Sequence, residues 1–204
     1  MDGTPMNLHQ RPLKRARPYH HGDLSKALRE AASSILETEG LEALSLRSVA
    51  RRAGVSHAAP YRHYLNREAL LADVATAGFE QLRQELIQAA SAPGQEADRI
   101  AHIGGAYVRF ASHHGGLLRL MFGPQLPNRM DFPALATAAD AIGDEIGKAL
   151  GDRALGLAVW ATVHGLSMLI LEDVVDLGQR QSGVDVLPSR AEILLRSLFN
   201  KIAA

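Results

Sequence analysis

The sequence contains no cysteine among its 204 residues. Without a thiol, the chain has no disulfide scaffold, no cysteine-ligated zinc site and no thiol nucleophile. Aromatic residues make up only 5% of the chain, but hydrophobic residues reach 47% and charged residues 22%. These fractions are ordinary for a globular protein, so wholesale disorder is excluded. The length suits one large domain or two small ones.

Net charge is also absent, because 22 Lys and Arg residues balance 22 Asp and Glu residues. Residues 1–67 nevertheless carry 11 basic and 6 acidic side chains, a net charge of +5. The remainder carries 11 basic and 16 acidic side chains, a net charge of −5. A basic third followed by an acidic two-thirds suggests two separate tasks, although chance unevenness explains the counts equally well.

The N-terminus lacks a signal-peptide pattern, because its polar, basic stretch is followed by no apolar run. Residues 154–171 carry no formal charge and are almost long enough to cross a bilayer. The run includes Thr162 and His164 and is followed by Glu172, so we interpret it as a helix buried on most sides, in a core or a subunit interface. We therefore expect a cytoplasmic protein without a membrane segment.

The spacing of apolar residues predicts an all-α protein. Residues 1–19 are basic and proline-containing and lack periodicity, so we expect a flexible arm there. Apolar positions then recur at intervals of three and four residues, first between Asp23 and Gly40. Further helices are expected over 46–53, 57–64, 67–90, 96–113, 116–122, 134–150, 153–176 and 189–203, with loops at 123–133 and 177–188.

Residues 44–64, LSLRSVARRAGVSHAAPYRHY, have the pattern of a helix-turn-helix. Ala50 is small enough for a second helix to pack over it, and Val49 and Val55 fill the space between the two helices. Gly54 lies at the turn, where a left-handed backbone is needed. The second helix then presents one face to a DNA major groove. The alternative is an ordinary helical hairpin.

Residues 19–71 resemble the DNA-binding region of the TetR family of bacterial transcription regulators. The shared order is a helix ending in Glu-Gly, then Leu-Ser-Leu-Arg, Ala-Gly-Val-Ser, Tyr-Arg-His-Tyr and Arg-Glu-Ala-Leu-Leu. Further along, Trp160 with His164 and Gly165 resembles a tryptophan-histidine-glycine motif in the effector domain of one subgroup.

The resemblance implies a three-helix, helix-turn-helix DNA-binding domain at 20–66, preceded by the basic arm at 1–19. A helical-bundle dimerisation and effector-binding domain follows at 67–204. The implied protein is a homodimer that binds a palindromic operator in double-stranded DNA and is released by a small apolar effector. The resemblance favours a repressor, but a repressor and an activator share the same kind of DNA-reading helix, so the sequence does not distinguish them.

The resemblance also implies which residues contact DNA. Ser45 and Arg47 match phosphate-contacting positions, as do Tyr61 and His63, while the start of the reading helix faces base edges. Arg67 stands where the family usually has lysine, and both are cationic. The full predicted set is Ser45, Arg47, Ser56, His57, Ala58, Ala59, Tyr61, Arg62, His63 and Arg67.

Two positions depart from the family pattern. Pro60 occupies a position that is usually apolar and removes one early helical hydrogen bond, which is tolerable only near the first turn. Tyr64 replaces the usual phenylalanine, so its hydroxyl needs solvent or a partner. The arm adds a separate question, because its basic residues either insert into a minor groove or form a solvated tail (Arg11, Lys14, Arg15 and Arg17).

The remaining two-thirds of the chain carries candidates for an interface and a pocket. The uncharged helix around Trp160 and the last helix are the candidate dimer interface, the latter through Ile193, Leu194, Leu195, Leu198, Phe199 and Ile202. A stripe of Gly143, Gly147 and Gly151 permits close approach of another helix. The candidate effector pocket is formed by Tyr107, Phe110, Met121, Phe122, Trp160, His164 and Met168. Each of these residues also suits an ordinary core.

Catalysis has little support in the sequence. Nine histidines are present, but the pairs His20-His21 and His113-His114 are adjacent and do not share a helix face. No His-Glu-x-x-His, phosphate-loop, dinucleotide-binding or Gly-x-Ser-x-Gly motif appears. We therefore expect no enzyme activity, no cofactor and no metal.

Overall fold

The computed structural model describes residues 21–126 and 128–203, so the predicted basic arm lies outside the described residues. Within this part, every regular element is helical, which confirms the all-α prediction. The elements are α1 (His21–Thr38), η1 (Leu41–Ala43), α2 (Leu46–Arg52), η2 (Pro60–Arg62), α3 (Arg67–Ala90), α4 (Glu96–His113), α5 (Gly115–Phe122), η3 (Arg129–Asp131), α6 (Pro133–Leu150), α7 (Arg153–Leu171), α8 (Gln179–Ser182), η4 (Val184–Val186) and α9 (Leu187–Ala203).

Apart from the segment 57–64, helix boundaries follow the predicted ones closely except after α7. This helix ends at Leu171 rather than at residue 176, because the chain turns at Asp173, whose φ of 57° is left-handed. The amides of Val174 and Val175 then bond back to the carbonyl of Leu169, closing the turn. The loop predicted over 177–188 contains the short helix α8 and the 3-10 turn η4.

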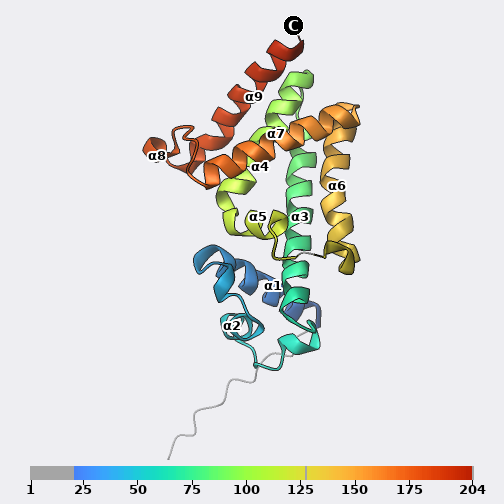
Figure 1. Ribbon diagram of the computed structural model, residues 1–204, viewed down its shortest axis with the longest axis vertical. Helices are drawn as coiled ribbons and strands as arrows, with labels where there is room; N and C mark the ends of the chain where they lie inside the picture. The colour runs from blue at the N-terminus through green and yellow to red at the C-terminus, as the bar shows by residue number, and fades with distance from the viewer. Residues whose placement is uncertain (1–20, 127, 204) are drawn as a thin grey trace, which may run out of the picture.

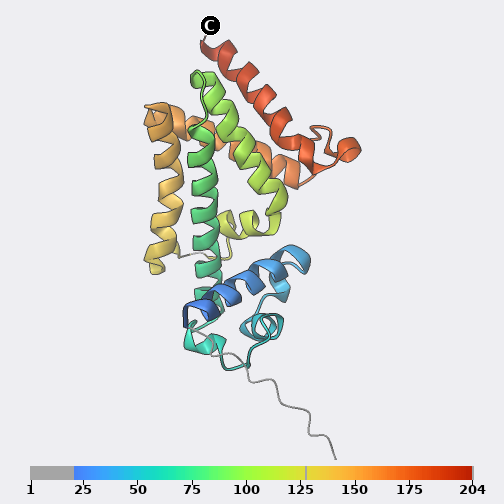
Figure 2. The same ribbon diagram turned by 180° about the vertical axis from the view of Figure 1, so that it is seen from behind.

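The helix α3 joins the two ends of the molecule. Its first turns lie beside α1, and its later turns run between α4 and α6 (Figure 1). Above them, α7 crosses α6 and α4, and α9 packs along α4 (Figure 2). The main buried apolar core runs from Leu28 on α1 through α3 to Val163 on α7 and Leu195 on α9. A second, smaller cluster joins α4, α7 and the start of α9 through Val108, Ile170, Leu187 and Ala191.

Two of the three glycines in the predicted stripe mark a close helix crossing within the chain. The backbone of Gly147 on α6 lies so near Gly156 on α7 that a Cβ on Gly156 would come within 2.6 Å of Gly147 Cα. Gly143 lies under the ring of Trp160. Gly151 has another role, since its φ of 69° ends α6 in a left-handed cap.

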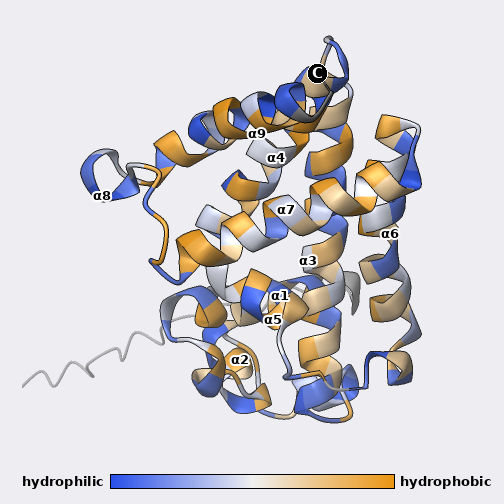
Figure 3. Cartoon of the chain, turned by 45° about the horizontal axis from the view of Figure 1, so that its top comes forward, coloured by the Kyte–Doolittle hydropathy of each residue, from blue (hydrophilic) through white to orange (hydrophobic). Residues whose placement is uncertain are grey.

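Only one face of α7 is buried in the chain, so the prediction of burial on most sides is wrong for a single copy. The buried residues are Gly156, Val159, Val163, Ser167 and Ile170. By length and composition α7 passes as a membrane span, but one such helix is weak evidence, and 28% of its apolar window is buried. Its outward face and that of α9 are rich in apolar residues (Figure 3).

Candidate nucleic-acid interface

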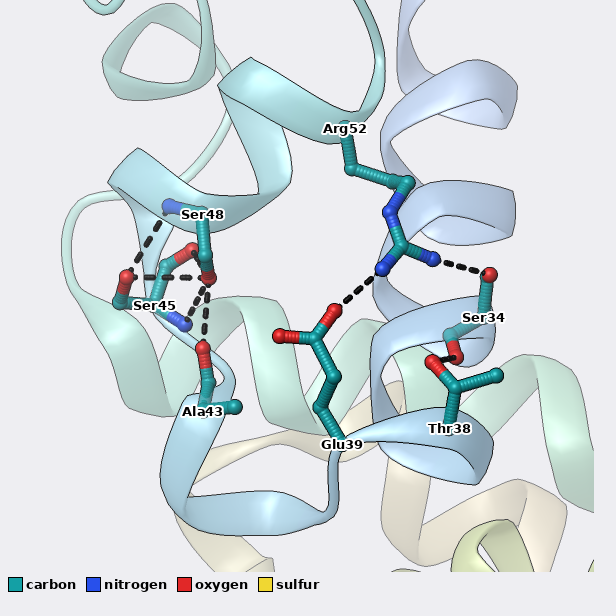
Figure 4. A network of polar contacts seen from close by, with 7 residues as sticks. All are labelled: Ser34, Thr38, Glu39, Ala43, Ser45, Ser48 and Arg52. Carbon is teal, nitrogen blue, oxygen red and sulfur yellow. Dashed lines mark hydrogen bonds and ion pairs between the residues drawn. The ribbon is translucent and has the colours of Figure 1, made fainter.

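Helix α2 begins at a capping box formed by two serines. The Ser48 backbone N–H donates to Ser45 Oγ at 3.1 Å, and the Ser45 N–H donates to Ser48 Oγ at 2.9 Å. The Ser48 hydroxyl also donates to the Ala43 carbonyl at 2.7 Å (Figure 4). These bonds satisfy amides that a helix start otherwise leaves unpaired. They fix the helix start from which Ser45 and the exposed Arg47 are presented.

The turn after α2 has the geometry that the sequence predicts. Gly54 has a φ of 69°, in the left-handed region, and the Val55 N–H donates to the Ala50 carbonyl at 3.0 Å. Val49 and Ala50 are fully buried, and Val55 is partly buried against the core. The tight turn brings the next segment across α2, as in a helix-turn-helix.

Replacement of Gly54 tests the turn directly. No atom lies within 4 Å of a Cβ added there, so the cost comes from the backbone angle alone. We expect Gly54→Val to destabilise the protein by about 2 kcal/mol, since a β-branched residue adopts this angle poorly. Gly54→Asn, which tolerates the angle, should cost less than about 1 kcal/mol. Urea unfolding of both variants measures the difference, and equal costs would refute the turn assignment.

The predicted reading helix over 57–64 is instead a set of tight turns around η2. Pro60 has no N–H, so the Ser56 carbonyl cannot accept the bond that an α-helix would place there. It accepts instead from the Ala59 N–H at 2.9 Å, and the Ala59 carbonyl accepts from the Arg62 N–H at 3.2 Å. These three-residue spacings are those of a 3-10 helix. Pro60 stands at its first position, where a proline is accommodated.

Most of the predicted DNA-contacting residues are exposed in the segment after α2. Ser56, His57, Ala58, Arg62 and His63 are exposed, and Ala59 is partly exposed. Among the residues that the structure describes, Tyr61 keeps 55% of its surface in solvent, which is a large value for an aromatic side chain.

Arg67 differs from the other members of the set. Its Nε donates to the Leu44 carbonyl at 2.8 Å, and its Nη2 donates to the Leu41 carbonyl at 2.9 Å. The guanidinium thus ties the start of α3 to the segment that enters α2. Its predicted phosphate contact stays a prediction, and its observed contacts give it a role in holding α2 in place.

One arginine of this surface was missed by the sequence analysis. Arg51 is exposed and lies four residues after Arg47, so both project from the same face of α2. The neighbouring Arg52 points the other way, where it pairs with Glu39 and donates to Ser34 Oγ on α1 (Figure 4). The four-residue spacing was the available signal.

The hydroxyl of Tyr64 finds its partner on α3. It donates to Asp73 Oδ2 at 2.6 Å, and the same oxygen accepts from Arg29 Nη1 on α1 at 3.2 Å. Burial, reinforced by the neighbouring carboxylate, raises the pKa of Tyr64 far above its usual range, so the phenol stays protonated. The network joins the segment after η2 to both α1 and α3.

Four of the seven predicted effector residues form one cluster between α4, α5 and α7. The hydroxyl of the fully buried Tyr107 lies 2.9 Å from His164 Nδ1. The ring of Phe122 lies 4.4 Å from His164 and 6.2 Å from Trp160, between ring centroids. Burial raises the pKa of Tyr107 and lowers that of His164, so both side chains are uncharged near neutral pH.

The other three predicted pocket residues make different contacts. The Phe110 ring lies against His114 at a tilt of 52° and lines a hollow of its own, Met121 packs beside Gly78, and Met168 packs against the core. An apolar hollow of about 320 Å³ between α3, α4 and α6 contains none of the seven. The predicted set therefore mixes one polar-aromatic cluster with ordinary core residues.

Taken together, the glycine turn, the exposed face beside it and the helical bundle above define a helix-turn-helix transcription regulator. The family model for bacterial regulatory proteins of the tetR family matches residues 28–74. The model for the tetracyclin repressor-like C-terminal domain matches residues 100–184. The chain belongs to the TetR family of transcriptional regulators.

Solved structures agree with this assignment. A protein of unknown function from Rhodococcus sp. RHA1 is 34% identical, with a TM-score of 0.65, over 89% of this chain and 98% of that chain. The fatty acid degradation regulator FadR from Bacillus halodurans shares the fold at 12% identity and a TM-score of 0.65, over 90% and 97% of the two chains. A tetR-family regulatory protein from Rhodococcus RHA1 shares it at 20% identity and a TM-score of 0.60, over 85% and 95%. The comparison with curated proteins gives no match.

Proposed function

We propose that this regulator is a homodimeric repressor that binds a palindromic operator and is released by a small, uncharged, apolar effector. The observation that carries the proposal is the placement of two surfaces at opposite ends of α3. One is the exposed, arginine-bearing face around α2 and η2, and the other is the exposed apolar face of α7 and α9. The DNA-facing surface of one chain covers only a few base pairs, so a second copy of the chain is needed for useful affinity for DNA.

The apolar face supports the dimer. Leu157 on α7 is 59% exposed and Ile193 on α9 is 66% exposed. Leu169 on α7 and Leu194 and Leu198 on α9 are exposed as well. Exposed apolar side chains on two helices that both pack on α4 are typical of a subunit interface. We propose that this face pairs with its copy about a two-fold axis. On this basis we propose the division that the sequence predicts, with a DNA-binding unit at 20–66 and a dimerisation and effector unit at 67–204.

The Tyr107–His164–Trp160 cluster supports an effector without charge. Tyr107 and His164 are neutral, and Tyr107 is buried in the apolar core, so a charged molecule would be poorly solvated beside them. On its outer side Trp160 borders a hollow that Asp140, Asp144 and Arg153 also line. The buried Trp160 Nε1 has no acceptor among the residues described and is suited to donate to a ligand oxygen. We propose that the effector binds against this cluster, in the cytoplasm where the operator DNA is found.

Replacement of His57 or Tyr61 by Ala tests the DNA-facing surface. Both side chains are exposed, so their loss should weaken specific binding about 5- to 100-fold while the melting temperature stays within about 2 °C. Fluorescence anisotropy with labelled duplex and thermal melting measure the two effects. Ile87→Ala, a partly exposed apolar residue on the distant half of α3, is the matched control. Lower stability with unchanged DNA affinity would assign both residues to the core.

Selection of bound duplexes from a random DNA pool at fixed salt tests the proposed function. We expect recovery of a two-fold symmetric sequence. A pool without enrichment would contradict the proposal. The position of the recovered site in a promoter then separates repression from activation, since overlap with the polymerase site gives repression.

A further inference from the structure

Helix α5 receives its N-terminal cap from the DNA-binding end of the chain. The carboxylate of Glu37, near the end of α1, accepts from the Gly116 N–H at 3.0 Å through Oε2 and from the Leu117 N–H at 2.9 Å through Oε1. Both amides belong to the first turn of α5, which otherwise lacks acceptors for them. A carboxylate on two such amides is a charge-assisted contact, favoured further by the helix dipole.

The contact is also sterically close. A Cβ at Gly116 would lie 2.8 Å from the Leu36 carbonyl oxygen and 3.1 Å from Glu37 Oε2. Only glycine therefore allows α5 to sit this near to α1. A hollow of about 490 Å³ opens beside the joint and is lined by both helices, so the joint has room to tilt.

The opposite end of α5 reaches the polar-aromatic cluster. The ring of its last residue, Phe122, packs against His164 at a tilt of 51°, with 4.4 Å between ring centroids. The same ring meets Phe79 of α3 edge-on, with 5.1 Å between ring centroids. Trp160, the only tryptophan in the chain, lies 6.2 Å from the same ring. One eight-residue helix thus touches α1 at its first turn and the cluster at its last residue.

We infer that Glu37 is a positioning residue that couples the two ends of the molecule: its carboxylate clamps α5 to α1, so a shift of Phe122 at the cluster moves α1 and the DNA-facing surface with it. The inference rests on the proposed function, since the coupling regulates DNA binding. Glu37 lies outside the predicted DNA-contacting surface and acts through α5. Thermodynamic linkage makes such a coupling reciprocal, so DNA binding must also change the surroundings of the polar-aromatic cluster.

The fluorescence of Trp160 distinguishes coupling from a purely structural cap. If Glu37 only capped α5, its loss would not alter the response of this fluorescence to DNA. Saturating the full-length protein with the selected duplex should change Trp160 emission. In Glu37→Ala we expect affinity within about threefold of the unaltered protein but less than about one-third of the emission change. Glu37→Gln, which keeps one acceptor, should fall between the two. Glu42→Ala removes an exposed carboxylate of η1 and should leave the emission change intact. An undiminished change in both Glu37 variants, or no change in the unaltered protein, overturns the inference.

A second measurement needs no DNA and so separates this inference from the proposed function. Phe122→Leu removes the ring that stacks on His164. Hydrogen exchange of the amides at the end of α1, residues 33–39, should then accelerate about threefold. In a Glu37→Ala background the same substitution should have no effect on those amides. Equal acceleration in both backgrounds overturns the coupling even if a palindromic operator has been recovered. The expected result supports the coupling even if no duplex is selected.

Discussion

Charge placed on the exposed face of α7 and α9 is expected to convert the protein into a monomer and to weaken operator binding at least about 100-fold. The double variant Leu157→Arg, Ile193→Arg tests this. Burial of one Leu or Ile side chain contributes about 1.5–3 kcal/mol, and a two-fold interface doubles each loss. The buried charges add a further desolvation penalty. Since both residues are exposed in the single chain, its fold should persist.

Sedimentation measures the mass of the variant, and fluorescence anisotropy measures its affinity for the selected duplex. Met130→Arg is the matched control, because Met130 is 83% exposed but lies in η3, away from both helices. The control should remain a dimer with full affinity. A double variant that stays dimeric and binds normally would place the interface elsewhere.

Gly156→Ala is expected to give the largest loss of stability, about 3 kcal/mol in the free energy of unfolding. The added methyl would lie 2.6 Å from Gly147 Cα and from its backbone nitrogen. Backbone cannot rotate away as a side chain can, so α6 and α7 must separate and lose packing along their length.

Gly143→Ala is a control at the same helix crossing. Its added methyl would lie 3.3 Å from two carbons of the Trp160 ring, a contact that a small ring movement relieves. We expect a cost below about 1 kcal/mol, partly offset by the higher helix propensity of alanine. Urea unfolding of the two variants gives both values, and similar costs would contradict the close crossing.

Local sequence signals predicted the parts of this fold that depend on neighbouring residues. Ser45 and Gly54 set the start and end of α2 through bonds and angles within a few residues, and both were identified correctly. Periodic apolar residues likewise predicted α3 and α4 within their observed limits. The reading segment was the local failure, because the missing N–H of Pro60 decided for 3-10 geometry over an α-helix.

Contacts between distant residues could not be read in the same way. Glu37 and Gly116 are 79 positions apart, and no local sequence pattern in either segment predicts the hydrogen bond between them. Arg51 and Arg52 are neighbouring arginines on α2 that the sequence alone does not distinguish. The position of α1 decides that Arg52 pairs with Glu39 while Arg51 stays exposed. The predicted pocket shows the same limit, since residue type selected aromatic and methionine side chains but tertiary packing decided which of them meet.

The proposed repressor needs two DNA-facing surfaces held together in one dimer, and the affinity of the protein for half an operator tests this requirement most directly. Fluorescence anisotropy at fixed salt compares the selected palindrome with a duplex of equal length in which one arm is scrambled. We predict that the scrambled duplex binds at least about 100-fold more weakly and that the intact palindrome carries protein chains in pairs. Equal affinity for both duplexes, with one chain bound to each, would contradict the account.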